Sequence, residues 1–210
     1  MSEQANLIDH FEDELQDIKK PSPFRWILGL FLIFMMILWF IPSYQIQIDP
    51  PPARIPTVEE VSSITEYDRI ESNNIQDYVI IDSEIKGVAD RIATIACDSN
   101  QKKCQARAMF GFVQENFEYV SDPTSFEYMK TAKESLVNGA AGDCDDSSIA
   151  LATLLESIGI PARFVFVPGH VYVEGYINNK WEPMDATCSN CNFGEIHYKY
   201  AKDEKRIVNA

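Results

Sequence analysis

The chain has 210 residues, which is enough for one ordinary domain plus accessory segments, because single domains cluster near roughly 100–150 residues. Its formal net charge of -14 argues against a nucleic-acid-binding surface, since phosphate binding requires clustered lysine and arginine side chains. The contents of 46% hydrophobic and 11% aromatic residues exclude a largely disordered chain, so most of the sequence should pack.

Residues 1–24 are interpreted as a cytoplasmic tail. Apolar residues recur at helical spacing between residues 5 and 18, and this pattern predicts a short amphipathic helix. The sequence leaves open whether this helix binds a partner protein, lies on the membrane or frays in solution.

Residues 25–43 are predicted to form one membrane-spanning helix. After Arg25 the run to Ile41 carries no charge, and at ~1.5 Å rise per residue it covers roughly 26 Å of the ~30 Å hydrocarbon layer. Trp26 and Trp39 fall near the two expected interfaces. The alternative is a cleaved signal peptide, but the run exceeds the ~7–15-residue apolar region of such a peptide and no small-residue cleavage site follows it.

The basic residues on either side of this run predict its orientation. Lys19, Lys20 and Arg25 precede the uncharged run, whereas Arg54 is the first cation after it. Since positive charge is retained on the cytoplasmic side, the N-terminus is expected inside and the remainder of the chain outside. The predicted location is therefore the cell membrane, crossed once.

A proline-rich segment, residues 44–75, follows the predicted membrane helix. Proline-rich segments are extended and semi-rigid, so this one is expected to act as a stalk. It would hold a domain of residues 76–210 away from the bilayer.

The five cysteines divide into two pairs and one single residue. Cys97 and Cys104 flank a polar turn, and Cys188 and Cys191 lie in a CSNC sequence. In an oxidising compartment each pair is predicted to form a disulfide, which leaves Cys144 as a free thiol. The alternative is a zinc site of four thiolates from the two pairs, although only the second pair has CxxC spacing.

Three helical stretches are predicted within the domain. Residues 82–117 carry apolar side chains at spacings of three and four, which indicates a helical hairpin around the first cysteine pair, and residues 126–137 form another helix. A third helix should begin at Cys144, after a Gly-Asp entry, and end before Gly159 and Pro161, which are typical stop signals.

Strands are expected after this helix, at residues 162–167, 170–177 and 180–187. The last two are joined by Asn-Asn, residues that tolerate the positive φ of a two-residue hairpin turn. If the last residue of one strand pairs with the first residue of the next, His170 and Asp185 share a face as diagonal neighbours, with Cα atoms roughly 7–8 Å apart. A slip of one residue would place them on opposite faces.

Cys144 is the candidate nucleophile. Its place in the first turn of a helix favours a thiolate, because the unpaired N–H groups and the helix dipole stabilise negative charge. Its backbone N–H is a natural oxyanion donor. The carboxylates of Asp143, Asp145 and Asp146 should oppose a further negative charge, so the thiolate is expected to need an imidazolium partner.

His170 is the best candidate for that partner, since the two other histidines lie in the tail and beyond the predicted hairpin. Asp185 would fix the tautomer of the imidazole and stabilise its charged form. Each residue also has a structural interpretation, as a core cysteine, a satisfied strand histidine or a turn-capping aspartate. Their combination favours the catalytic interpretation.

The chain here resembles the transglutaminase-like superfamily, and the resemblance covers roughly residues 85–190. The motifs that carry it are Gly142-Asp143-Cys144 at a helix start, the run Gly159-Ile160-Pro161-Ala162-Arg163, His170 on a strand, and Trp181 with Asp185 four residues on. The resemblance implies an α+β fold with a papain-like core, in which helices pack on an antiparallel sheet.

The resemblance also implies that Cys144, His170 and Asp185 act as nucleophile, base and orienting residue in chemistry on amides. That chemistry is acyl transfer from glutamine, peptide hydrolysis, deamidation or deglycosylation. The chain departs from many members in having Tyr172 where they have tryptophan. The sequence shows no calcium site, so the calcium dependence of animal transglutaminases is not carried over, and no cofactor or metal is expected.

The leading interpretation is a membrane-anchored enzyme outside the cytoplasm that acts on peptide or side-chain amide bonds through a thioester at Cys144. Hydrolysis is slightly preferred over acyl transfer. Its expected partners are a protein or peptide substrate and the membrane. The alternative is a catalytically silent module of the same fold that binds peptide or cell-wall material.

Overall fold

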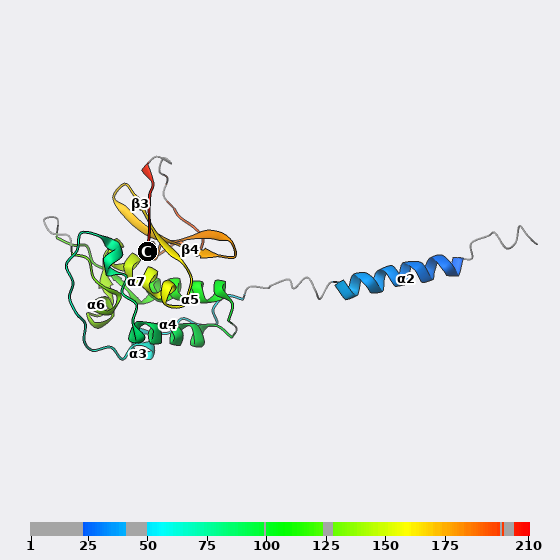
Figure 1. Cartoon of the computed structure of the whole chain (residues 1–210), viewed down its shortest axis with the longest axis horizontal. Coiled ribbons are helices and arrows are strands. Elements are labelled where there is room, and N and C mark those ends of the chain that lie inside the picture. Colours follow the sequence, from blue (N-terminus) through cyan, green and yellow to red (C-terminus); the bar gives the residue numbers. More distant parts are fainter. Residues whose placement is uncertain (1–22, 41–49, 99, 124–127, 198, 200–203) are drawn as a thin grey trace, which may run out of the picture. The chain divides into compact units, whose positions relative to one another are not determined.

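The computed structural model describes residues 23–40, 50–98, 100–123, 128–197, 199 and 204–210 (Figure 1). The chain divides into two units, Met1–Ile48 and Asp49–Ala210. The amphipathic helix predicted between residues 5 and 18 lies outside the described residues.

The described part of the first unit is one helix, α2, which covers Pro23–Phe40. Proline suits the first position of a helix, because its missing N–H would have no intrahelical acceptor there. Within the described part of the chain, no helix combines the length and the hydropathy that are needed to cross a membrane. The membrane span expected over residues 25–43 is not supported by this structure and stays a prediction.

The second unit contains the helices of the predicted domain. They are α3 (Val58–Val61), the 3-10 helix η2 (Ile75–Tyr78), α4 (Ser83–Ala96), α5 (Lys102–Asn116), α6 (Ala132–Val137) and α7 (Cys144–Ser157). The pair α4 and α5 confirms the predicted helical hairpin. Helix α6 is shorter than predicted, because the side chain of Thr131 accepts a hydrogen bond from Glu134 N and caps the helix at that point.

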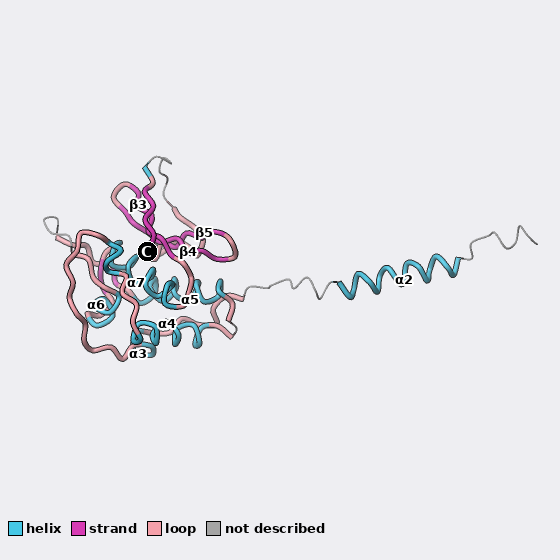
Figure 2. Tube along the Cα trace, in the orientation of Figure 1, coloured by secondary structure: helices cyan, strands magenta, loops and turns pink. Residues whose placement is uncertain are grey.

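An antiparallel sheet of four strands, in the order β5-β4-β3-β6, packs against the helices (Figure 2). The strands are β3 (Ala162–Val167), β4 (His170–Ile177), β5 (Lys180–Met184) and β6 (Arg206–Asn209). Strand β6 was not predicted from the sequence. Two short parallel strands, β1 (Glu118–Tyr119) and β2 (Ala141–Gly142), form a separate pair, and β2 directly precedes α7.

The hairpin of β4 and β5 has the predicted register. Ile177 pairs with Lys180, and the ladder continues to the pair of Val173 with Met184. The two turn asparagines have φ angles of 51° and 64°, which is the left-handed region that a two-residue turn requires. The register therefore places His170 and Asp185 on one face, as the sequence analysis expected.

The segment that the sequence analysis interpreted as a stalk contacts the helices over much of its described length. Ala53 N donates to Ala96 O at 2.8 Å, Ile55 packs against the core, and Val61 is 1% exposed. A Cβ atom at Gly111 of α5 would lie 2.8 Å from Ile55 Cδ1, so this glycine makes room for Ile55. Residues that follow the prolines are thus part of the packed unit.

Helix α7 is the central element of the second unit, since it contacts α4, α5 and α6 as well as β3 and β4 (Figure 2). Its apolar side chains are almost completely buried: Ile149, Leu151, Leu154 and Leu155. A fully buried helix is held by packing on all sides rather than on one stripe. Its N-terminal residue, Cys144, is consequently fixed close to the start of β4.

Candidate active site

The three predicted site residues come from the starts or ends of three elements. Cys144 begins α7, His170 begins β4, and Asp185 directly follows β5. The structure brings them together: His170 Nε2 lies 3.0 Å from Asp185 Oδ2, and the His170 ring is hydrogen-bonded to the Cys144 side chain. Cys144 is half-buried and is the one free cysteine in the described part of the chain.

Asp185 is held by more than His170. Its side chain is 2% exposed, and its Oδ1 atom accepts hydrogen bonds from Thr187 N at 3.2 Å and from Thr187 Oγ1 at 2.7 Å. Both carboxylate oxygens therefore have donors, which a buried carboxylate requires. Thr187 was not predicted from the sequence, although an aspartate that bonds the residue two positions on is a recognisable turn pattern.

The pKa of His170 reflects its surroundings. Burial lowers it, but hydrogen bonds to Asp185 and Cys144 outweigh burial and raise the pKa to about 9. The ring is therefore an imidazolium at neutral pH when Cys144 is its partner. This is the charge state that the sequence analysis required for a thiolate at Cys144.

The first turn of α7 leaves one backbone donor for a ligand. Asp143 caps the helix, since its side chain accepts from Asp145 N, and Asp146 N donates to Asp145 Oδ1. Ser147 N donates to Asp143 O. Within the described residues, the structure gives the N–H of Cys144 no acceptor, so this group is open to an oxyanion next to the thiol.

Asp146 does not oppose a thiolate in the way that the sequence suggested. Its Oδ1 atom accepts from Lys130 N at 2.7 Å, and its Oδ2 atom lies 2.6 Å from Lys130 Nζ. Burial lowers the pKa of Lys130, but the hydrogen bond to Asp146 outweighs burial and raises it. The lysine stays charged and compensates the carboxylate.

Asp145 is also neutralised, by another cause. Burial first, and then its hydrogen bond to Asp143, raises the pKa of Asp145 to about 9. The group is therefore a neutral carboxylic acid at pH 7. Of the three acidic residues that adjoin Cys144, one is paired and one is protonated, so the electrostatic obstacle to a thiolate is much smaller than three charges.

The glycine of the Gly-Asp-Cys motif, Gly142, is required for a steric reason. A Cβ atom at Gly142 would lie 2.2 Å from Asp146 Oδ2 and 2.5 Å from Asp146 Cβ. Only glycine lets β2 run past the buried carboxylate into the first turn of α7. The motif thus couples the position of Cys144 to the Asp146–Lys130 pair.

Two other motif residues stabilise the sheet. The guanidinium of Arg163 lies 4.0 Å from the ring centroid of Trp181, and Arg163 Nε donates to Glu174 Oε2 at 2.8 Å. Cation–π contact and a charge-assisted hydrogen bond together fix neighbouring strands. Arg163 and Trp181 therefore have a structural role that does not involve Cys144.

A cleft of about 590 Å³ opens in front of Cys144 and His170. Its walls include residues that sequence reasoning did not connect with the site. These residues come from the segment around η2, from the loop before α6 and from β6: Asn73, Asn74, Ile75, Gln76, Met129, Arg206 and Val208. The cleft is thus completed by segments far from Cys144 in the sequence.

Both predicted disulfides are present. Cys97 bonds to Cys104, and Cys188 bonds to Cys191. The alternative of a zinc site made of four thiolates is therefore wrong for this structure.

Two clusters of potential metal ligands occur among the described residues, each with donor atoms within 4.8 Å of one another. The first is Asp143, Asp145 and Asp146. It is a poor cation site, because one carboxyl is protonated and another is paired with lysine. The second cluster contains Cys188, Cys191 and His197.

Several solved structures are similar to the chain. A protein from Cytophaga hutchinsonii is 19% identical over 61% of this chain and 46% of that one, with a TM-score of 0.42. The periplasmic domain of TgpA from Pseudomonas aeruginosa, bound to ethylmercury, is 18% identical over 55% and 49%, with a TM-score of 0.41. Calcium-bound LapG from Legionella pneumophila is 21% identical over 64% and 80%, with a TM-score of 0.43.

The chain thus spans less than half of the first two of these structures. No curated protein matches the chain. A family model does match, and the matched segment, residues 88–186, includes Cys144, His170 and Asp185. The matched model is that of the transglutaminase-like superfamily, and the match covers slightly less than half of the chain.

Proposed function

We propose that this chain is a cysteine-nucleophile enzyme that acts on peptide or side-chain amide bonds. In this proposal Cys144 is the nucleophile, His170 is the base, and Asp185 orients the ring of His170. The observation that carries the proposal is the contact of one imidazole with both partners: Asp185 Oδ2 at 3.0 Å and the Cys144 side chain. This arrangement of nucleophile, base and orienting residue is what thiol catalysis requires.

The first half-reaction follows from the two ring nitrogens. Asp185 occupies Nε2 of His170, which leaves Nδ1 for the thiol. In the resting ion pair the thiol proton already lies on Nδ1, and the thiolate attacks the amide carbonyl carbon. The backbone N–H of Cys144 stabilises the resulting oxyanion. His170 then returns the proton to the departing amine, the C–N bond breaks, and a thioester remains on Cys144.

The second half-reaction uses the same base. His170 takes a proton from water or from an amine, whose oxygen or nitrogen attacks the thioester carbonyl. The C–S bond breaks and the proton returns to Cys144. Water gives hydrolysis and an amine gives acyl transfer. We propose hydrolysis as the main outcome, because water is present at a far higher concentration than any acceptor amine.

The two disulfides support a location outside the cytoplasm, since disulfides persist in oxidising compartments. The proposal therefore keeps the domain outside and the N-terminal tail inside, with a protein or peptide as substrate. Labelling intact cells with a membrane-impermeant amine reagent tests this location. Labelling of Lys180, which is exposed, supports it, and labelling only after lysis contradicts it.

The central test is the alkylation of Cys144 by iodoacetamide in the non-reduced full-length chain. Full length is needed because residues 50–75 pack against the domain. The reagent should modify Cys144 alone, since the other four cysteines are in disulfides. His170→Ala should slow the modification at least tenfold, whereas His197→Ala, which changes an exposed histidine, should not. Equal rates in both variants would rule out the ion pair.

A second measurement separates the enzyme from the silent binding module. A peptide library is incubated with the chain, and new amines and released ammonia are quantified with and without an added acceptor amine. Turnover that disappears in Cys144→Ala supports the enzyme. Peptide binding without turnover or thioester, unchanged in Cys144→Ala, contradicts it.

A further inference from the structure

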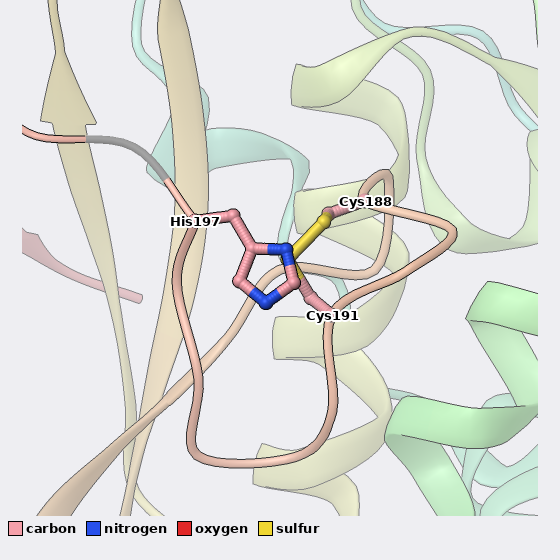
Figure 3. Close-up of side chains that lie close together, drawn as sticks. All are labelled: Cys188, Cys191 and His197. Carbon is pink, nitrogen blue, oxygen red and sulfur yellow. A yellow bond between two sulfur atoms is a disulfide. The ribbon is translucent and has the colours of Figure 1, made fainter.

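A cluster of two sulfurs and one imidazole lies at the C-terminal side of β5, outside the proposed active site. Figure 3 shows the ring of His197 beside the disulfide of Cys188 and Cys191. One ligand atom from each residue lies within 4.8 Å of the other two. Once the disulfide is reduced to two thiolates, two sulfurs and one nitrogen at such distances form a ligand set that zinc prefers.

The turn that carries the two cysteines is fixed by more than the disulfide. Cys191 N donates to Cys188 O at 3.1 Å. Gln114 Nε2, from α5, donates to Cys188 O at 2.7 Å and to Cys191 O at 3.0 Å. These hydrogen bonds do not involve sulfur, so cleavage of the disulfide leaves both side chains projecting from one turn.

His197 has the neighbour that a ligating histidine usually has. Its side chain is 51% exposed, and its Nε2 atom lies 3.7 Å from Glu195 Oε2. This separation is an ion-pair distance, and a small rotation that brings the carboxylate to hydrogen-bond distance of one ring nitrogen would make the other nitrogen a better ligand. Glu195 is itself held by Asn192 Nδ2 at 2.9 Å.

We propose that Cys188, Cys191 and His197 bind one zinc ion when the Cys188–Cys191 disulfide is reduced. A dithiol reductant becomes a disulfide, and its two electrons and two protons convert this disulfide into two thiols. Zinc binding then releases both thiol protons, and water completes the tetrahedral site. The disulfide and the zinc ion are thus alternative ways to close the same turn.

The required movement is small. Two Zn–S bonds of about 2.3 Å at a tetrahedral angle place the sulfurs roughly 3.8 Å apart. The Cα atoms of Cys188 and Cys191 are 5.3 Å apart, so rotation of the two side chains is enough to reach that separation. The backbone hydrogen bonds of the turn can remain in place.

The test is zinc titration of the full-length chain with Cys144→Ser, which removes the one free thiol. The protein is reduced with a phosphine, desalted without oxygen and titrated with zinc against a chromophoric chelator. We expect one zinc ion per reduced chain. Cys191→Ser should abolish this binding, and His197→Ala should weaken it at least tenfold.

Cys97→Ser is the matched control, because it breaks the other disulfide and should leave zinc binding unchanged. Cobalt(II) in place of zinc should give a thiolate-to-metal charge-transfer band in the reduced chain only. Absence of zinc uptake on reduction, or uptake that survives in Cys191→Ser, overturns the proposal. Metal binding is measured without any substrate, so a negative result would not bear on the proposed enzyme function, which is tested separately.

Discussion

Lys130 forms an ion pair with Asp146, a buried residue in the first turn of α7. Lys130 Nζ lies 2.6 Å from Asp146 Oδ2, and the Asp146 side chain is 1% exposed. The backbone of Gly142 passes close to the same carboxylate on its other side, so a side chain at position 142 would collide with Asp146. Cys144 therefore begins a helix whose N-terminus is positioned by a charge pair.

Removal of Lys130 should destabilise the fold strongly. Lys130→Met leaves the Asp146 carboxylate buried with no cation, and loss of one partner of a buried pair costs about 3–5 kcal/mol. Lys133→Met is the matched control, since Lys133 pairs with Asp82 and Glu84 near the surface, where a pair contributes about 1 kcal/mol or less. Urea denaturation of both variants measures the difference. Equal costs would show that the buried pair has no special role.

Asp145→Asn should stabilise the protein at neutral pH. The acid is protonated in the folded chain up to about pH 9 but ionises near pH 4 when unfolded. Because its folded pKa is raised, wild-type stability falls as pH rises through this window, by up to about 1.4 kcal/mol per pH unit. An asparagine side chain at position 145 can still accept a hydrogen bond from Asp146 N and donate one to Asp143. It cannot ionise, so it does not lose stability as the pH rises.

The measurement for Asp145→Asn is the free energy of unfolding at pH 5 and at pH 8. The increase in unfolding free energy of Asp145→Asn over wild type should be larger at pH 8 than at pH 5. Asp90→Asn is the control, because Asp90 is exposed and pairs with Lys86 at the surface. A gain that does not change with pH would contradict a protonated Asp145.

The contribution of His170 to the free energy of unfolding should depend on pH, and comparison with the variant His170→Gln measures this contribution. Its folded pKa of about 9 lies above the usual 6.5, so its stabilising contribution is complete below pH 6.5 and is lost as pH rises through 9. The difference in unfolding free energy between wild type and His170→Gln should be at most about 3 kcal/mol at pH 6. This difference should decrease as the pH rises and should level off above pH 9.5, where the ring is neutral. A difference that increases with pH would refute the raised pKa.

Gly142→Ala should be severely destabilising, although the change adds one methyl group. The added Cβ would overlap the Asp146 side chain at 2.2 Å, and hydrogen bonds from Lys130 hold this carboxylate in place. Gly87→Ala is the control, because its Cβ would meet only the flexible end of Arg91 at 3.6 Å. Alanine within α4 should raise stability by about 0.5–1 kcal/mol. Thermal unfolding of both variants distinguishes the two effects.

The parts of the site that could be predicted from the sequence depend on local rules. The register of β4 and β5 follows from a two-residue turn, so the shared face of His170 and Asp185 could be obtained by counting. The start of α7 at Cys144 follows from its capping residue, Asp143. Such signals lie within a few residues of what they determine.

The remaining features depend on contacts between distant segments. Strand β6 is four residues long, and only its pairing with β3, such as Val208 with Phe164, makes it a strand. The neutralisation of Asp146 requires Lys130, which is sixteen residues away. Proline content suggested a stalk, but the pocket that Gly111 leaves for Ile55 could not be read from either segment alone. Packing over such separations overrides local propensity.

Thr187 is predicted to position Asp185, and therefore to influence Cys144 without touching it. Thr187→Val removes the hydroxyl that donates to Asp185 Oδ1 at 2.7 Å, while the backbone N–H at 3.2 Å remains. A hydrogen bond to a charged group contributes about 1.5–3 kcal/mol, so alkylation of Cys144 and amide turnover should slow roughly tenfold or more. Thr187→Ser retains the hydroxyl and should restore both rates, which a role in packing alone would not explain. If the Thr187→Val variant reacts at the wild-type rate, or the Thr187→Ser variant reacts as slowly as Thr187→Val, the hydroxyl does not position Asp185.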